Sequence, residues 1–342
     1  MLSHKTELAP DCLMDGIGKP IYGQFDGIVR DLGLKHFHYF NDMDKPASWL
    51  SRYFDYKQFQ FISIKTPHFI IGAAIADIRY LGSGFCYLYD IHNNQLEEVN
   101  WLRPPKSGYT TQASPRNSKA FIGNATKKIS FTLEDGTWLV EIATDKIQAN
   151  VRLVPETLSL PIAMCSPTGY NGWTYTQKHN AIKPVGTLSV NNELQPLNHA
   201  LASYDFSAGY MRRETSWRWA SINTKVDNTL IGLNLASGVN ETGSCENVLW
   251  VNGERHLLTP VHFKFDRHRQ FDESWHIYSE NGQVDLHFTP RNVRSEKLNL
   301  WLLKSNFRQF IGDFNGYLID NQGHKHVLSS ELGFTEDHFA RW

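Results

Sequence analysis

The stretch Trp275–Phe288, WHIYSENGQVDLHF, decides the fold class of this chain. In its second half, QVDLHF, apolar and polar residues alternate, which is the period-two pattern of a strand with one buried face. Asn281-Gly282 separates the two halves, and Asn-Gly suits the positive φ angles of a type I′ turn. The stretch therefore predicts a tight antiparallel β-hairpin.

The same turn signal recurs along the chain, between other segments rich in apolar residues. It occurs at Asp135-Gly136, Asn252-Gly253 and Asn315-Gly316. Phe59–Ile64, FQFISI, alternates as a strand should. The one segment for which we expect a short helix is Glu331–Phe339, near the end of the chain. Strands separated by tight turns predict an all-β sandwich or barrel.

Composition supports this fold class and excludes several functions. The chain has 342 residues, enough for about two domains, and its 13% aromatic content favours strands. Its formal net charge of −1 gives no electrostatic drive toward nucleic acid. No run of about 18 apolar residues occurs, so we expect no integral membrane segment.

The four cysteines indicate a reducing compartment. Cys12, Cys86, Cys165 and Cys245 lie far apart and form no CxxC motif. A disulfide framework and a thiolate metal site are therefore both unsupported. The N-terminus lacks the basic and apolar pattern of a signal peptide, and we expect a cytoplasmic protein.

A segment rich in proline and glycine, between Pro161 and Leu188, is the expected domain boundary. It gives an N-terminal domain over residues 1–180 and a C-terminal domain over residues 185–342. A weak internal repeat links the two halves, because Ile71–Asp77 (IGAAIAD) is similar to Ile231–Ser237 (IGLNLAS). The repeat predicts a tandem duplication.

We interpret the stretch YDFSAGYMRRETSWRWAS, residues 204–221, as the wall of a binding site, because no other segment combines so many aromatic and ionisable groups. Trp217 and Trp219 share one face of the expected strand, and Arg218 lies on the other. Asp205 and Glu214 are the candidate catalytic acids. A carboxylic acid buried beside aromatic rings has a raised pKa and can protonate an alkene. In the alternative, Glu214 pairs with a neighbouring arginine and the rings fill the core.

The expected ligand contacts are aromatic, basic and polar side chains in or after this stretch. They are Tyr204, Tyr210, Arg212, Arg213, Trp217, Trp219, Asn234, Glu246, Asn247 and Trp250. Asn234, Glu246 and Asn247 could instead satisfy buried backbone groups. The basic, aromatic segment Phe263–Phe271 could contact an anionic head group, or be a solvated loop.

Cofactor and metal sites are not expected. The chain has none of the nucleotide-binding or metalloprotease motifs, so we predict no cofactor. His324 and His326 alternate on an expected strand, but the sequence offers no third ligand at a suitable spacing. We therefore predict no metal.

Four segments resemble a bacterial family without an established activity, the domain of unknown function 2804 family. They are Gly209–Ser221, Gly172–Lys178, Glu246–Trp250 and Ser305–Gly316. More distantly, Glu214 followed by Trp217 and Trp219 is similar to the carotenoid 1,2-hydratase, tocopherol cyclase and AttH-like group. This second resemblance implies two lipocalin-like (calycin) barrels in tandem, and some members of that group act on isoprenoids in a barrel cavity.

We expect an all-β protein of two antiparallel calycin-like barrels with few short helices. The leading functional hypothesis is binding of a lipophilic small molecule, of isoprenoid or acyl type, in a barrel or between barrels. One alternative is a cofactor-free hydratase, cyclase or isomerase with a carboxylic acid as proton donor. Another is a structural or interaction module without a ligand. The sequence leaves the oligomeric state open.

Overall fold

The computed structural model describes residues 6–105, 107–238, 243–269, 271, 273–300 and 303–342. The described chain is nearly all β, which confirms the predicted class, and its one α-helix is the six-residue α1 (Trp49–Phe54). Ser48 caps this helix, because its Oγ accepts a hydrogen bond from the Ser51 amide at 3.1 Å. No helix among these residues has the length and apolar character needed to cross a membrane.

The chain forms two compact units. The first comprises the described residues of Met1–Asn93, Glu97–Glu156 and Pro161–Arg212, and the second those of Asn94–Leu96, Thr157–Leu160 and Arg213–Trp342. The main division thus falls between Arg212 and Arg213, not between residues 180 and 185 as expected from the sequence. Strand β13 (Gly172–Val190) crosses the expected boundary as one continuous strand.

The first sheet has 15 strands. Besides β13 they are β1 (Thr6–Leu8), β2 (Gly23–Asp26), β3 (Tyr56–Lys65), β4 (Phe69–Asp77), β5 (Gly82–Asp90), β6 (Gln95–Arg103), β7 (Tyr109–Thr111), β8 (Ser118–Gly123), β9 (Lys128–Glu134), β10 (Thr137–Ala143), β11 (Ile147–Val154), β12 (Ile162–Thr168), β14 (Glu193–Leu194) and β15 (Leu201–Tyr210). Its main path runs β6-β5-β4-β3-β15-β13-β11-β10-β9-β8-β7. Because β4 and β5 also pack against β8 and β9, this sheet forms a nearly closed barrel.

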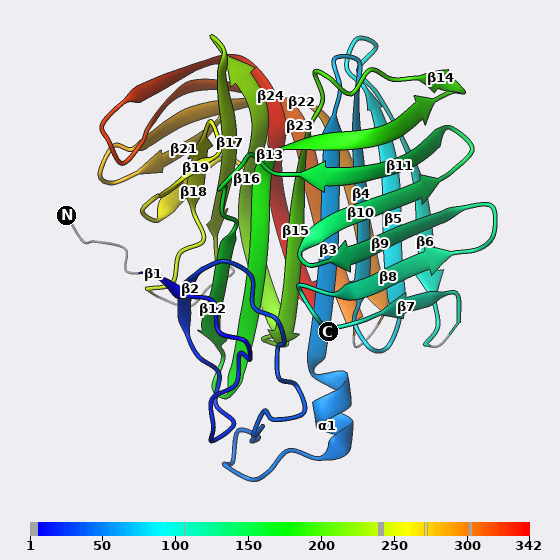
Figure 1. Ribbon diagram of the computed structural model, residues 1–342, viewed down its shortest axis with the longest axis vertical. Helices are drawn as coiled ribbons and strands as arrows, with labels where there is room; N and C mark the ends of the chain where they lie inside the picture. The colour runs from blue at the N-terminus through cyan, green and yellow to red at the C-terminus, as the bar shows by residue number, and fades with distance from the viewer. Residues whose placement is uncertain (1–5, 106, 239–242, 270, 272, 301–302) are drawn as a thin grey trace. The chain divides into compact units, whose positions relative to one another are not determined.

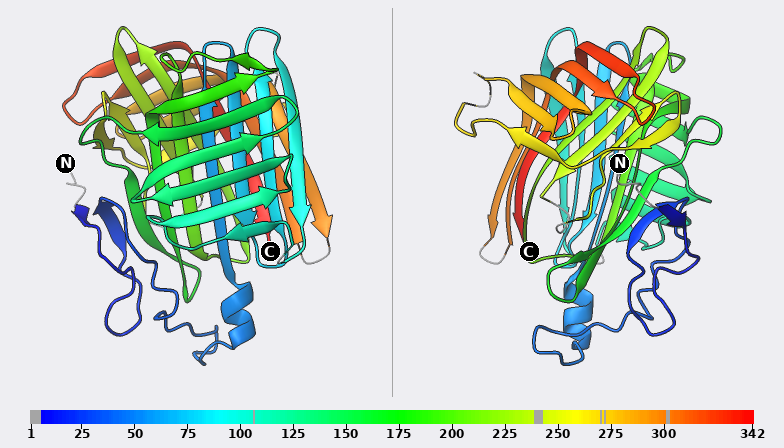
Figure 2. Two further views of the ribbon diagram at one scale, coloured as in Figure 1. Left: turned by 45° about the vertical axis from the view of Figure 1, so that its right-hand side comes forward. Right: turned by 90° about the vertical axis from the view of Figure 1, so that its left-hand side faces the viewer.

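Strand β13 turns the corner of this barrel. Its first half pairs with β15, and its second half pairs with β11. The register shifts between His179 and Ile182, where Ala181 adopts a left-handed φ of 55°. The strands that follow β11 in the sheet therefore run across β3, β4 and β5 (Figures 1 and 2). The core between these layers is strongly aromatic and includes Trp138 and Trp173.

The second sheet has nine strands. They are β16 (Glu214–Val226), β17 (Thr229–Ser237), β18 (Val248–Val251), β19 (Glu254–Leu257), β20 (Val261–Lys264), β21 (Trp275–Ser279), β22 (Val284–Leu300), β23 (Leu303–Ile319) and β24 (Lys325–Arg341). Their order is β19-β18-β17-β16-β24-β23-β22-β21-β20, and the sheet curves into a half-barrel in which the edge strand β20 approaches β17. The predicted hairpin is present, because β21 and β22 pair antiparallel with Trp275 opposite Phe288.

Two local predictions were wrong. Asn315-Gly316, expected as a tight turn, lies within β23, where the register with β24 shifts. Residues Glu331–Phe339, expected as a short helix, belong to β24. This strand pairs with β16 on one side and β23 on the other, so its backbone hydrogen bonds are made in the sheet. Sheet pairing on both sides outweighs the weak local preference for a helix.

Both sheets use the same order of pairing. In the first, β3 to β6 form a meander, and β3 also pairs with the late strand β15. In the second, β16 to β19 form a meander, and β16 also pairs with the last strand, β24. The two repeat segments noted in the sequence lie on corresponding strands of these meanders, β4 and β17.

Candidate functional site

A row of polar side chains crosses four neighbouring strands of the second unit. Arg218 on β16 lies opposite Ser237 on β17 and Asp337 on β24, and Asp337 lies opposite Arg308 on β23. Residues opposite each other in a sheet project from the same face, so these four side chains share one face. Ala220, two residues after Arg218 on β16, projects from the same face and belongs to the buried apolar core. The row therefore borders the apolar interior of the half-barrel.

Three arginines surround the carboxylate of Asp337, whose side chain is only 2% exposed. Arg267 binds it with two hydrogen bonds, from Nε at 2.8 Å and from Nη2 at 2.9 Å. Arg218 Nε lies 3.3 Å from Oδ1, and Arg308 Nη2 also contacts the carboxylate. One carboxylate cannot neutralise three guanidinium groups, so the cluster carries an excess of positive charge.

The arginines also determine the protonation state of Asp337. Burial alone raises the pKa of a carboxyl group, because it disfavours the charged form. Here the hydrogen bonds from Arg267 and the charges of Arg267, Arg308 and Arg218 outweigh burial, and the pKa of Asp337 lies below its ordinary value. Asp337 is therefore a carboxylate at neutral pH and cannot serve there as a proton donor.

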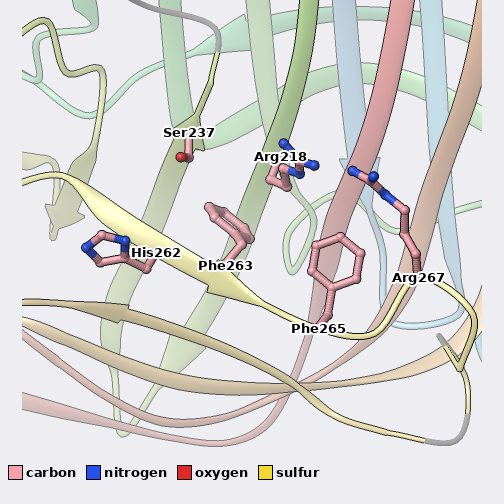
Figure 3. Close-up of a pocket in the computed structure, with 6 residues that line it drawn as sticks. All are labelled: Arg218, Ser237, His262, Phe263, Phe265 and Arg267. Carbon is pink, nitrogen blue, oxygen red and sulfur yellow. The ribbon is translucent and has the colours of Figure 1, made fainter. Parts of the chain in front are cut away.

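A pocket of about 410 Å³ opens beside this cluster (Figure 3). Its lining residues are Arg218, Ser237, His262, Phe263, Phe265 and Arg267. Strand β20 and the segment after it bring His262, both phenylalanines and Arg267 to the pocket. Figure 3 shows the two guanidinium groups above the two phenylalanine rings. The pocket thus combines a cationic wall with an apolar wall, and its volume falls within the range of small-molecule sites, about 300–1,000 Å³.

Stacking holds the apolar wall in place. The ring of Phe265 lies on the buried Trp275, with 3.8 Å between the centroids and 5° between the planes. Trp275 in turn contacts Phe310 of the core, at 5.2 Å between centroids. These rings therefore anchor the segment that also carries Arg267.

The two tryptophans of the candidate stretch face away from this pocket. As the alternation predicts, Trp217 and Trp219 share the face opposite Arg218. Trp217 Nε1 donates to Glu336 at 3.1 Å, and Trp219 Nε1 donates to Asn234 at 2.8 Å. Both indole N–H groups therefore already have protein acceptors.

Three further residues expected to contact a ligand bind main-chain atoms instead. Asn234 Nδ2 donates to the carbonyl of Glu246 at 2.8 Å, and Asn247 accepts a hydrogen bond from the Ala236 amide at 2.7 Å. Trp250 Nε1 donates to the Leu160 carbonyl at 2.8 Å. These contacts match the alternative interpretation, in which polar side chains satisfy buried backbone groups. The side chain of Glu246 is buried as well.

The aromatic and acidic residues that begin the candidate stretch belong to the first unit. Tyr204 and Tyr210 lie in the core of the first barrel, where Tyr204 stacks on Trp138 at 4.9 Å between centroids. Asp205 lies 3.2 Å from Lys178 Nζ and accepts a hydrogen bond from Ser207 at 2.9 Å. The Asp205 carboxylate therefore lies beside a positive charge, not in purely apolar surroundings.

Arg212, Arg213 and Glu214 lie where the two units meet in the sequence. The two arginines follow β15 and precede β16, and Glu214 is the first residue of β16. The Glu214 side chain is 58% exposed and lies 3.4 Å from Arg341 Nε. The burial that would make Glu214 a proton donor is absent in this structure.

Three residues of the cluster were not predicted as site residues: Arg218, Arg308 and Asp337. Arg267 was included only as part of the segment Phe263–Phe271. Two signals were present. Arg218 alternates with the two tryptophans, and Arg267 lies in the basic, aromatic segment Phe263–Phe271. Arg308 and Asp337 gave no signal, because only the pairing of β23 with β24 brings them together.

Comparison with solved structures finds chains of similar architecture at low sequence identity. A protein described as AttH, from Nitrosomonas europaea, is 12% identical, with a TM-score of 0.47 over 82% of this chain and 91% of the other. Kievitone hydratase from Nectria haematococca is 13% identical, with a TM-score of 0.49 over 84% of this chain and 88% of the other.

Among curated proteins, no relative matches this chain. One family model matches residues 12–342, which is nearly the whole sequence. The chain therefore belongs to the family described as domain of unknown function DUF2804.

Proposed function

We propose that the protein binds a lipophilic small molecule of acyl type, with a carboxylate end, in the pocket of the second unit. The carboxylate binds Arg218 and Arg267, and the chain lies against Phe263 and Phe265. The observation that carries this proposal is the pairing of two arginines with two phenylalanines around one pocket. A guanidinium fork matches a carboxylate in shape and charge, and it remains charged at every physiological pH.

The charge of the cluster supports an anionic ligand over a neutral one. Asp337 alone cannot neutralise Arg218, Arg267 and Arg308, and all three contact it. A ligand carboxylate would add a second negative charge beside them. The Arg218 side chain is 27% exposed, so water screens its attraction for a ligand carboxylate less than at a fully exposed site.

The enzymatic alternative has weaker support. Protonation of an alkene requires a carboxylic acid that remains neutral. Glu214 is largely exposed, Asp205 lies beside Lys178, and Asp337 is held ionised. None of these three described acids has the apolar surroundings that the mechanism requires, so we favour binding over catalysis.

The test compares ligands that differ only in the head group. Displacement of a fluorescent fatty acid from the full chain is measured with dodecanoate and with dodecanol. We expect dodecanoate to bind at least about tenfold more tightly, because a hydrogen bond to a charged group contributes about 1.5–3 kcal/mol. Equal affinity for the acid and the alcohol would refute a head-group role for the arginines.

Variants locate the site. Arg267→Gln removes a pocket guanidinium and is expected to weaken dodecanoate binding about tenfold, with dodecanol unaffected. Arg269→Gln is the matched control, because Arg269 lies two residues further along the same segment and pairs with Glu273 at 2.5 Å. Unchanged binding in Arg267→Gln, or an equal loss in Arg269→Gln, would place the ligand elsewhere.

A further inference from the structure

Three side chains that can bind metal ions gather on the β21–β22 hairpin. His276 and His287 lie opposite each other in register, and Asp285 precedes His287 by two residues on the same strand. All three therefore project from one face of the sheet. The other face carries Ile277 and Leu286, which are buried in the core. One ligand atom from each of the three side chains lies within 4.8 Å of the other two.

The local contacts already hold these groups together. His276 Nε2 lies 2.8 Å from Asp285 Oδ1, and the rings of His276 and His287 stack at 4.6 Å between centroids and 3° between planes. The other ring contact of His276 is with Tyr278, at 4.8 Å. To bind a zinc ion, the three ligand atoms, which lie within 4.8 Å of one another, would each have to come to about 2.0–2.2 Å from it.

The site is accessible from solvent. The side chains of His276 and Asp285 are 36% and 41% exposed, and His287 is exposed as well. An ion can therefore reach the three groups without opening the core. The remaining coordination positions would face water, as expected where the protein supplies only three ligands.

We propose that His276, Asp285 and His287 form a binding site for a divalent cation of the zinc type. Imidazole nitrogen suits Zn²⁺ and the neighbouring first-row metals, whereas Mg²⁺ and Ca²⁺ favour oxygen ligands. Two histidines with one carboxylate are an established ligand set for such ions. The prediction of no metal considered only His324 and His326; a two-residue turn at Asn281-Gly282 already places His276 opposite His287.

The bound ion would connect two neighbouring strands. Strand β21 pairs with β22 on one side and with β20 on the other. Strand β20 carries His262 and Phe263 of the pocket. The cation would thus stiffen the sheet next to the pocket wall, although the metal site does not depend on what the pocket binds.

The experiment measures Zn²⁺ binding to the full chain, first freed of metal with EDTA and then titrated in competition with a chromogenic chelator. We expect wild-type protein to bind Zn²⁺ at a site whose affinity falls about tenfold or more in His276→Gln, in His287→Gln and in Asp285→Asn. Co²⁺ in place of Zn²⁺ should give visible absorption bands that weaken in the same variants. Thermal melting in EDTA checks that each variant is folded.

Two control variants address the other histidines. His199 is exposed in the first unit, and His324 belongs to a second histidine–aspartate group, 3.2 Å from Asp320. His199→Gln and His324→Gln should retain the tight site. The proposal is wrong if His276→Gln and His287→Gln bind Zn²⁺ like the wild type. It is also wrong if the tight site is lost in His324→Gln and kept in His276→Gln.

Discussion

Arg218 on β16 and Asp337 on β24 lie directly opposite each other, with Arg218 Nε 3.3 Å from Asp337 Oδ1. These strands are the first and last of the second sheet in sequence and are neighbours in the middle of it, so the ion pair joins the beginning and the end of the segment that forms the sheet. Arg267 and Arg308 complete the charge around the same carboxylate. A single buried acid therefore organises the cationic wall of the pocket.

Replacement of this acid should destabilise the protein strongly. In Asp337→Asn the three arginines lose their common carboxylate, and loss of one partner from a buried ion pair costs roughly 3–5 kcal/mol. The free energy of unfolding in urea measures the effect. Asp135→Asn is the control, because Asp135 pairs with Arg116 at an exposed site, where an ion pair contributes about 0–1 kcal/mol. Similar losses in the two variants would contradict the central role of Asp337.

The stability of the protein should depend on pH through His338. Burial and the charge of Arg294 lower its pKa to about 3, although Asp337 acts in the opposite direction. The ring contacts Trp217 and Phe307, and its Nε2 lies 3.0 Å from Ser305 Oγ. Its ordinary value is 6.5, so the unfolded chain gains a proton as the pH falls below about 6.5 while the folded protein does not.

The stability that His338 contributes is therefore complete above pH 6.5 and decreases as the pH falls toward about 3. Its share of the slope is at most about 1.4 kcal/mol per pH unit. Urea unfolding is measured between about pH 4.5 and 7.5, on either side of 6.5. The free energy of unfolding should depend less steeply on pH in His338→Gln than in the wild type. The exposed-site control His199→Gln should keep the wild-type slope. Identical slopes in all three proteins would disprove the assignment.

Asn234 should matter for stability and not for ligand binding. It accepts a hydrogen bond from Trp219 Nε1 and donates one to the Glu246 carbonyl. Asn234→Leu removes both hydrogen bonds. The loss should lower the free energy of unfolding by roughly 1–3 kcal/mol for each buried group left without its partner, the Trp219 indole N–H and the Glu246 carbonyl. Asn234 faces away from the pocket, so dodecanoate affinity should be unchanged.

A double-mutant cycle with Trp219→Phe isolates the bond between the two side chains. The unfolding free energies of the two single variants and the double variant give the coupling, which should be about 0.5–3 kcal/mol for groups in direct contact. A coupling near zero, or a loss of dodecanoate affinity in Asn234→Leu, would argue for the ligand contact that the sequence suggested.

The sequence predicted what local rules determine. Asn281-Gly282 and the alternation after it correctly predict the β21–β22 hairpin, although only Gly282, and not Asn281, has the positive φ expected for a type I′ turn. The same alternation correctly separated Trp217 and Trp219 from Arg218. Local patterns predicted only an all-β sandwich or barrel. The more specific prediction of two lipocalin-like barrels came from the resemblance to the AttH-like group.

The remaining features depend on strand pairing over long sequence separations. Which face of β16 lines the pocket, that of the two tryptophans or that of Arg218, depends on β24. This strand brings Asp337 to Arg218 from more than a hundred residues away. Asp337 itself lies in the segment for which a helix was expected. The arginine cluster therefore cannot be found without this long-range register.

The two acids chosen from the sequence should behave differently when they are replaced. Asp205 lies 3.2 Å from Lys178 Nζ, and both side chains are mostly buried, so Asp205→Asn should cost about 3 kcal/mol of stability. Glu214 is exposed beside Arg341, and Glu214→Gln should cost less than about 1 kcal/mol. Urea unfolding measures both. A large loss in Glu214→Gln would mean that its carboxylate is buried in solution, which would restore its case as a proton donor.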